Sequence, residues 1–342
     1  DPQGDGPVTS GRGPDSPSQS PGQSHYQTIF HCIEAASRYV PSTQSPAPAL
    51  QSLRELIPSL PAASAMAETD DGPPTSAQET LGLASVANNL LLLLDESSSA
   101  NPLGWETLGG IKRVLDELTD QLSTTIRREK AELVRGLYVI IDPTITGGRD
   151  PLTIAQAAIQ GGARMLQLRD KIRDKGDSLP LARGLQKLCA ESGASLILND
   201  HADVAAIVGS AGLHVGQTDL PVDQARQVLA SDQVIGRSNH EFDELVESES
   251  MGVDHVAFGP IYHTNTKGVG RPPQGTDRVR EARAIAKTPL VAIGGINAEN
   301  AAAVIEAGAD AICVTAAVGA APDPEAAAAK LVKVIEDAGG RI

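Results

Sequence analysis

The chain has 342 residues, a net charge of −15 and a pI near 4.9, and 41% of its residues are hydrophobic. This composition supplies a core for one large domain or two smaller ones and excludes a wholly disordered chain. The acidic surface and the 2% aromatic content argue against nucleic acid and anionic membranes as partners.

Two further features bear on the compartment. The longest aliphatic run, Leu90–Leu94, is far shorter than the roughly 20 residues of a membrane span. The cysteines, Cys32, Cys189 and Cys313, form no CxxC pair and no metal spacing, which predicts buried, reduced thiols in a cytoplasmic protein. No signal-peptide pattern opens the chain. Because the chain starts at Asp1 rather than Met, the sequence still leaves export open.

The composition and apolar pattern of residues 1–135 predict a disordered tail followed by a helical extension. Residues 1–24 are rich in Gly, Pro and Ser, as in a disordered tail. Within 25–135, helices are expected over 25–40, 77–95 and 106–135, and the Pro/Ser-rich linker over 41–76 could hold a single helical turn at 50–57. The last of them carries an apolar stripe made of Leu108, Ile111, Leu115, Leu118, Leu122 and Ile126. We interpret 25–135 as an appendage that docks on the main domain, with a partner-binding or dimerising helix pair as the alternative.

From Gly136 onward, short β-branched runs alternate with Ala-rich helical stretches. The expected strands are 137–141, 165–168, 195–198, 212–214, 234–235, 256–258, 290–293 and 311–314. Eight strand–helix units predict an α/β fold, a (β/α)8 TIM barrel over 136–342. A doubly wound open sheet is the alternative, and the absence of a glycine-rich dinucleotide turn after the first strand counts against it.

Active sites of such barrels lie at the carboxyl ends of the strands, so the polar residues that follow each strand matter most. Gln167, Arg169 and Lys171 follow the second strand, on one face by alternation. Two cations and an amide suit a phosphate or diphosphate, although a solvated rim cluster would look the same.

The ends of the third and fourth strands carry acidic and amide side chains. Asn199 and Asp200 follow the third strand, and Gln217 and Asp219 follow the fourth. Two carboxylates with no competing cation beside them suit Mg²⁺. The alternative is helix capping, since Asp200 precedes a helix and Asp219 lies two residues before Pro221.

The fifth and sixth strands are followed by substrate-contact candidates. Ser238 and His240 could touch a substrate and Asn239 could cap the next helix, although His240 also suits a structural role. His214 lies in a strand and suits a packing role. The loop over 259–275, which includes Thr264, Thr266 and Lys267, is long enough for a lid, and its hydroxyls and Lys suit phosphate.

The seventh and eighth strands are followed by a phosphate-site signature. Gly294 and Gly295 come after the seventh strand, and Val314 and Thr315 end the eighth. Backbone N–H groups at these two loops commonly bind phosphate in barrels, and glycine lets the backbone approach the anion. A tight Gly-Gly turn with no ligand is the alternative.

Taken in order, these motifs resemble the thiamine-phosphate synthase (thiamine-phosphate pyrophosphorylase) family over about 136–338. The residues that carry the resemblance are Gln167-Leu-Arg169-Asp-Lys171, Asn199-Asp200, Gly212-Leu-His214-Val-Gly216-Gln217-Thr-Asp219-Leu-Pro221, Gly236-Arg-Ser238, Gly259-Pro-Ile with Thr264-Asn-Thr266-Lys267, and Ala292-Ile-Gly294-Gly295-Ile296. Residues 1–135 resemble no family that we recognise.

The resemblance implies a transferase of thiamine biosynthesis. It would use Mg²⁺ to join hydroxymethylpyrimidine diphosphate to a thiazole phosphate, giving thiamine phosphate and pyrophosphate by a dissociative, carbocation-like substitution. Carried over by position, Asp200 and Asp219 would hold the metal; Arg169, Lys171, Asn199 and Lys267 the diphosphate; Gln167 and Ser238 the pyrimidine; and Thr264, Thr266, Gly294 or Gly295, Val314 and Thr315 the thiazole phosphate. Catalytic roles would fall to Arg169, Lys171, Ser238 and Lys267.

Four positions depart from the family pattern. Asp170 stands where Glu is usual, and Thr315 replaces a common Ser. His263 replaces a proline in the sixth loop. Arg237 stands where a small apolar residue is usual and is expected to add a cation near the pyrimidine.

Three other functions fit parts of the sequence. A related thiazole tautomerase would use His240 or His214 as its base and would need neither Arg169 nor the two aspartates. A non-catalytic barrel that binds phosphorylated ligands is the second, and a second activity in 25–135 the third. The expected partners are the two small substrates, and a homo-oligomer stays open.

Overall fold

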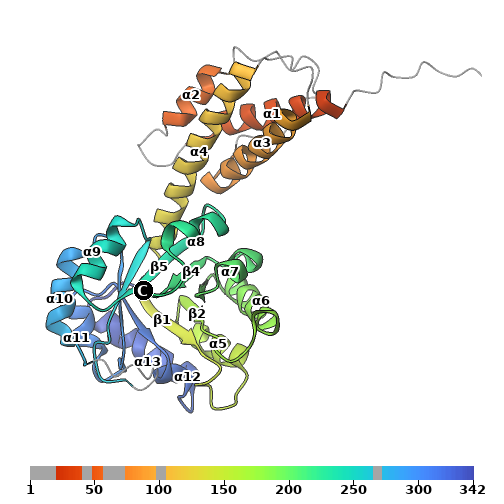
Figure 1. Ribbon diagram of the computed structural model, residues 1–342. Helices are drawn as coiled ribbons and strands as arrows, with labels where there is room; N and C mark the ends of the chain where they lie inside the picture. The colour runs from red at the N-terminus through yellow and green to blue at the C-terminus, as the bar shows by residue number, and fades with distance from the viewer. Residues whose placement is uncertain (1–20, 41–47, 57–73, 98–104, 265–271) are drawn as a thin grey trace, which may run out of the picture. The chain divides into compact units, whose positions relative to one another are not determined.

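The computed structural model describes residues 21–40, 48–56, 74–97, 105–264 and 272–342 (Figure 1). The chain divides into two compact units, Asp1–Leu122 and Ser123–Ile342. Of the predicted disordered tail, residues 1–20 lie outside the described part, and a helix begins at Pro21, four residues earlier than expected. Among the described residues no helix is long and apolar enough to cross a membrane.

The first unit is helical, as predicted. It contains α1 (Pro21–Ser37), α2 (Pro48–Leu56), α3 (Ala77–Ser97) and the start of α4 (Trp105–Ala131). The apolar stripe of α4 is buried along its length, and none of its six side chains is more than 7% exposed. Polar contacts join the helices at the rim, where the Asn88 side chain of α3 donates to Asp116 of α4 at 3.1 Å.

The second unit is a closed barrel of eight parallel strands in sequence order. The strands are β1 (Gly136–Ile141), β2 (Met165–Leu168), β3 (Ser195–Asn199), β4 (Gly212–Val215), β5 (Val234–Asn239), β6 (His255–Phe258), β7 (Leu290–Ile293) and β8 (Ala311–Val314). The pairing of β1 with β8 closes the sheet. This confirms the predicted (β/α)8 barrel and excludes the open sheet.

A helix follows each strand and covers the outside of the barrel (Figure 1). These helices are α5 (Pro151–Gln160), α6 (Lys175–Ser192), α7 (Ala202–Val208), α8 (Val222–Val228), α9 (Phe242–Ser250), α10 (Gly275–Ile285), α11 (Ala301–Glu306), the short α12 (Ala316–Gly319) and α13 (Pro324–Asp337). Local signals explain their starts. In α5, Pro151 fits the first turn because it needs no N–H partner there, and the Asp150 carboxylate accepts from Leu152 N.

Strand alternation creates two cores. Inward side chains such as Tyr138, Ile140, Ile197 and Val291 fill the barrel, together with Val134. Outward side chains pack against the helices in a larger cluster. All three cysteines are buried, as predicted, and no disulfide joins any two of them. Because side chains alternate, the residue two positions after an inward side chain points to the same side, so on β1 Asp142 follows Ile140 toward the cavity at the strand ends.

The last turns of α4 belong to the barrel unit. The Ser123 hydroxyl contacts the Ser231 hydroxyl at 2.8 Å, and Lys130 pairs with Asp232 at 2.7 Å. Arg127 lies 3.6 Å from Asp254. These contacts reach the loops that precede β5 and β6, the end of the barrel opposite the predicted site.

Candidate active site

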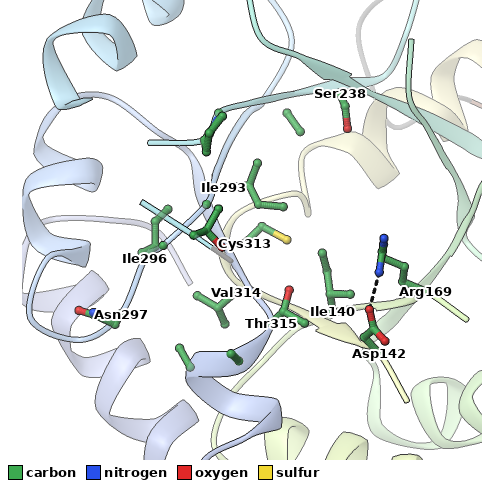
Figure 2. A pocket seen from close by; sticks show the side chains of 18 of the residues that line it. Ile140, Asp142, Arg169, Ser238, Ile293, Ile296, Asn297, Cys313, Val314 and Thr315 are labelled. Atoms are coloured by element: carbon green, nitrogen blue, oxygen red, sulfur yellow. Dashed lines mark hydrogen bonds and ion pairs between the residues drawn. The ribbon is translucent and has the colours of Figure 1, made fainter. Parts of the chain in front are cut away.

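A cavity of about 520 Å³ opens at the carboxyl ends of the strands. Figure 2 shows side chains of its lining, to which β1, β5, β6, β7, β8 and the loop after each of them contribute, together with Arg169 after β2. Seven predicted site residues line it: Arg169, Ser238, Thr264, Gly294, Gly295, Val314 and Thr315. Thr266 and Lys267 lie outside the described residues.

Arg169 reaches into the cavity and is held there by Asp142 (Figure 2). The Arg169 Nη1 to Asp142 Oδ2 distance is 2.5 Å, and the Asp142 side chain is fully buried. Asp142 also accepts from the backbone N and the hydroxyl of Thr144, at 2.9 and 2.6 Å. A guanidinium has five N–H donors, so one ion pair fixes its direction and leaves most of its donors for an anion.

Sequence reasoning missed Asp142. The signal was present, because Asp142 follows β1 directly and the rule applied to the other strand ends applies there too. Asp142 has no role in the resemblance, yet it holds the arginine that the resemblance assigns to the diphosphate.

Asp200 and Asp219 lie close together at the ends of β3 and β4. Burial raises the pKa of Asp219, and the neighbouring Asp200 carboxylate raises it further. A divalent cation would offset the repulsion between two such carboxylates. The donor set therefore fits Mg²⁺, which binds through one or two carboxylates plus waters and substrate phosphates. No group of three or more His, Cys, Asp or Glu suited to a metal occurs in the described part of the chain.

The expectation that no cation competes for these carboxylates is wrong. Lys171 reaches across from the end of β2 and forms an ion pair with Asp200. The sequence separates the two residues, and only the barrel brings the strand ends together. Helix capping is also wrong for both aspartates, since α7 is preceded by His201 and α8 by Pro221, and neither start is capped by a side chain.

Asp200 has an unusual backbone. Its φ is +65°, and among the described residues no other non-glycine residue has a positive φ. Its backbone N donates to the His214 carbonyl at 2.8 Å, which holds the conformation. Asp tolerates the left-handed region better than most residues, but the strain is still a typical property of functional sites.

Ser238 has a defined hydrogen-bond environment. Its hydroxyl lies 2.8 Å from His214 Nε2, and its carbonyl accepts from the Gln217 side chain at 2.7 Å. His214 therefore orients a cavity residue from behind, consistent with the packing role expected for it. His240 lines the cavity, and its Nδ1 lies 2.7 Å from the Gly259 carbonyl.

The remaining predicted residues lie beside or beneath the cavity. Gln167 is 3% exposed, does not line the cavity, and donates to the Tyr138 hydroxyl at 2.7 Å. Lys171, Asn199, Asp200 and Asp219 stand at the neighbouring strand ends outside the lining.

Two other expectations change in the structure. Arg237 points outward, toward Gln217 and Glu247, and does not line the cavity, so it adds no cation there. Asn239 does not cap α9: it bonds Ser248, and Glu241 caps that helix with Glu244.

The substitution at Asp170 is explained by its contacts. Its carboxylate accepts from Arg173 at 2.8 Å, from Ser178 at 2.9 Å, and from two backbone amides of the same turn. It thus shapes the turn between β2 and α6, a task for which the shorter acid is suited.

Glycines shape the end of the cavity near β7. Gly294 has a φ of +105°, and a Cβ there would lie 2.6 Å from Pro260 Cα. A Cβ at Gly295 would lie 2.4 Å from the His263 carbonyl oxygen and 2.9 Å from Tyr262 Cβ. The absence of side chains thus lets the sixth and seventh loops approach each other and form one wall.

Comparisons with known proteins agree with this arrangement. The sequence profile described as thiamine monophosphate synthase matches residues 137–318. The chain belongs to the thiamine monophosphate synthase family. A thiamine-phosphate synthase of Shouchella clausii is 44% identical over 202 residues, which are 59% of this chain and 97% of the relative. One of Moorella thermoacetica is 41% identical over 205 residues, 60% of this chain and 98% of the relative.

A solved structure supports the same family. The thiamine phosphate pyrophosphorylase of Pyrococcus furiosus has a TM-score of 0.57 and 31% identity, over 62% of this chain and all of that chain. Membership in the thiamine monophosphate synthase family makes the barrel an enzyme, a transferase of the pyrophosphorylase kind. The match covers the barrel and leaves the first unit unassigned.

Proposed function

We propose that the barrel joins hydroxymethylpyrimidine diphosphate to a thiazole phosphate, with Mg²⁺, and releases thiamine phosphate and pyrophosphate. The observation that carries this proposal is the cluster at the ends of β2, β3 and β4, where Arg169 and Lys171 stand beside the paired Asp200 and Asp219. This set combines fixed cations for a diphosphate with two carboxylates suited to a magnesium ion.

The reaction breaks the bond between the pyrimidine methylene carbon and the diphosphate oxygen. The bonding electron pair leaves with the diphosphate, and the lone pair of the thiazole nitrogen forms the new C–N bond. In the dissociative course that we propose, the first bond is largely broken before the second forms. The aminopyrimidine ring stabilises the positive charge on the methylene carbon, so no strong side-chain base is needed.

The chain's own tasks are then to hold the leaving group and to align the nucleophile. Arg169, fixed by Asp142, would bind the diphosphate oxygens. Lys171 would move from Asp200 to the diphosphate when the substrate binds. Asp200 and Asp219 would hold Mg²⁺, which when bound neutralises charge that develops on the leaving diphosphate.

The two substrates would lie at different parts of the rim. Ser238, oriented by His214, would hydrogen-bond the pyrimidine, with Gln167 supporting it from the layer beneath. The thiazole phosphate would bind at the wall that Gly294 and Thr315 line; Thr315 is labelled in Figure 2. Loops in these two positions commonly bind phosphate through backbone N–H groups in barrels of this kind.

Pyrophosphate release by the purified chain tests this function. Both substrates are supplied with Mg²⁺ or with EDTA, and thiamine phosphate is measured in parallel. Release that needs both substrates and the metal is expected. If proton exchange on the thiazole phosphate occurs without pyrophosphate release, the enzyme is a tautomerase and the proposal fails.

A matched pair of variants tests the metal assignment. Asp200→Ala should abolish Mg²⁺-dependent turnover. The control is Asp203→Ala, which removes an exposed aspartate three residues away that pairs with Lys175 at 2.9 Å. The control should retain activity, and equal activity of both variants would contradict the metal site.

A further inference from the structure

Arg237 is a buried cation that the mechanism does not use. Its side chain is 9% exposed. Alternation along β5 points Val234, Gly236 and Ser238 into the barrel and turns Arg237 toward the helices. Burial of a guanidinium costs free energy unless its donors are bonded, so the partners of Arg237 indicate its role.

Three partners surround the guanidinium. Its Nη1 donates to Glu247 Oε2 at 2.9 Å and to the Ser248 hydroxyl at 3.1 Å, both on α9. Its Nη2 donates to Gln217 Oε1 at 2.7 Å. Glu247 is half exposed, so this ion pair contributes little stability in water. The contact with Gln217 is the one that reaches toward the site.

Gln217 transmits this contact to the strand. Its amide oxygen accepts from Arg237, while its amide nitrogen donates to the Ser238 carbonyl at 2.7 Å. An arginine has donors only, so Arg237 forces the amide oxygen to face it. The amide nitrogen must then face Ser238. Without Arg237, a flipped amide would set two carbonyl oxygens against each other.

The segment held in this way carries Asp219. Gln217 belongs to the turn between β4 and α8, in which the Gly216 amide donates to Asp219 Oδ2 at 2.7 Å. The same glutamine therefore joins the turn to the residue assigned to the pyrimidine. The distance between the carboxylate and the Ser238 hydroxyl depends on this link.

We propose that Arg237 is a positioning residue that, through the Gln217 amide, fixes Asp219 relative to Ser238 and so sets the pyrimidine-diphosphate half of the site. The kinetic part of this inference rests on the proposed function. The structural part stands on its own, because it concerns the order of the turn 216–219 whatever the substrate.

Steady-state kinetics with Arg237→Leu test the kinetic part. The KM for hydroxymethylpyrimidine diphosphate should rise about tenfold, the scale of effect expected from misplacing a positioned group, while the KM for thiazole phosphate should stay the same. Arg237→Lys should recover part of the loss, because an ammonium can still donate to the Gln217 oxygen. Gln217→Glu should match Arg237→Leu, because a carboxylate has no donor for the Ser238 carbonyl.

A matched control separates positioning from folding. Arg226→Leu removes another partly buried arginine, which pairs with Asp254 at 2.5 Å at the opposite end of the barrel. It should lower thermal stability without raising one KM selectively. Equal changes of both KM values in Arg237→Leu, or a selective rise in Arg226→Leu, would overturn the positioning role.

Hydrogen exchange provides a readout that does not depend on activity. Peptides that cover 215–221 should exchange faster in Arg237→Leu than in wild type, because the Gly216 amide loses its fixed partner, and peptides of β1 should not change. Unchanged protection of 215–221 would refute the inference, whether or not the chain makes thiamine phosphate. Absence of product from the wild type would refute the proposed function alone.

Discussion

His255 should make the barrel lose stability in mild acid. It begins β6, points into the barrel, and is fully buried. Neither ring nitrogen has a hydrogen-bond partner among the described residues, and the ring of His214 lies 5.9 Å away. Burial lowers the pKa of His255 from 6.5 to about 4, although the Asp254 carboxylate opposes the shift.

The size of the effect follows from proton linkage. In the unfolded chain His255 binds a proton near pH 6.5, whereas in the folded barrel it does so only near pH 4. Stability is therefore unaffected above the unfolded pKa and falls as the pH drops through this window. Between pH 7.5 and 5.0 this single group should cost about 2 kcal/mol, and below pH 4 the full cost is about 3 kcal/mol.

Replacement by an apolar residue should remove this component. His255→Leu keeps the branching at Cγ, which matters because the ring lies directly against Gly236, where a Cβ would be 2.0 Å from His255 Nε2. The variant should lose less stability than wild type between pH 7.5 and 5.0.

The measurement must follow the barrel alone, because the chain has two units that can unfold separately. Urea titrations with pulsed hydrogen exchange, read on peptides that cover β6, give the free energy of unfolding of the barrel at each pH. If wild type and His255→Leu lose the same free energy between pH 7.5 and 5.0, His255 is not held neutral by burial and the reasoning is refuted.

Three further predictions concern the site and the unit boundary. Asp142→Asn should lower kcat/KM by about 10- to 100-fold with a small change in Tm, because the cavity arginine loses its charged partner; steady-state kinetics check this. Gly294→Ala should raise the KM for thiazole phosphate, because its Cβ would meet Pro260 at 2.6 Å, and an unchanged KM would contradict the role of this wall. A chain that starts at Ser123 should unfold by calorimetry at a higher temperature than one that starts at Arg128, because the shorter chain loses the contacts of Ser123 with Ser231 and of Arg127 with Asp254 and keeps only that of Lys130 with Asp232.

The barrel could be predicted because its signals are local. Each strand is a short β-branched or aliphatic run, and each helix has its own pattern, so alternation along the chain was enough for the order of elements. The short helix α12 was missed, because Ala316–Gly319 gives too few residues for a period. The helix start at Pro21 was also placed four residues late, where a polar first turn carries no apolar pattern.

The site could be predicted as a set of positions but not as a set of contacts. Strand ends meet at one face of any such barrel, so the strand-end rule placed Arg169, Ser238, Gly294 and Thr315 correctly around the cavity. The rule does not say how deep in the barrel, below the cavity, each side chain lies. Gln167 lies two residues before Arg169 on the same face of β2, too deep to line the cavity, and it bonds Tyr138 in the layer below.

The partners of the charged side chains could not be predicted from the sequence. Arg237 alternates with Ser238, so its direction could have been read from the strand, but its partners come from the turn after β4 and from α9. Lys171 and Asp200 are brought together only by the neighbouring positions of β2 and β3. Such contacts depend on three-dimensional closure, which no local pattern encodes.

The Lys171–Asp200 pair has a consequence for the proposed reaction. A diphosphate that enters the metal-free barrel must compete with Asp200 for the Lys171 ammonium, so it gains only the difference between two ion pairs. Mg²⁺ bound at Asp200 and Asp219 would remove that competition as well as add its own charge. Cation and diphosphate should therefore bind together far more tightly than either alone.

This reasoning predicts that Asp200→Asn acts in opposite directions on two measurements. In EDTA the variant should bind inorganic pyrophosphate more tightly than wild type, because Lys171 no longer has a charged partner. With Mg²⁺ the order should reverse, since a carboxylate ligand is lost. Calorimetric titration of pyrophosphate into both proteins measures the four affinities. Weaker binding by the variant in EDTA would show that Asp200 does not restrain Lys171, and the exchange of partners proposed for the reaction would have to be abandoned.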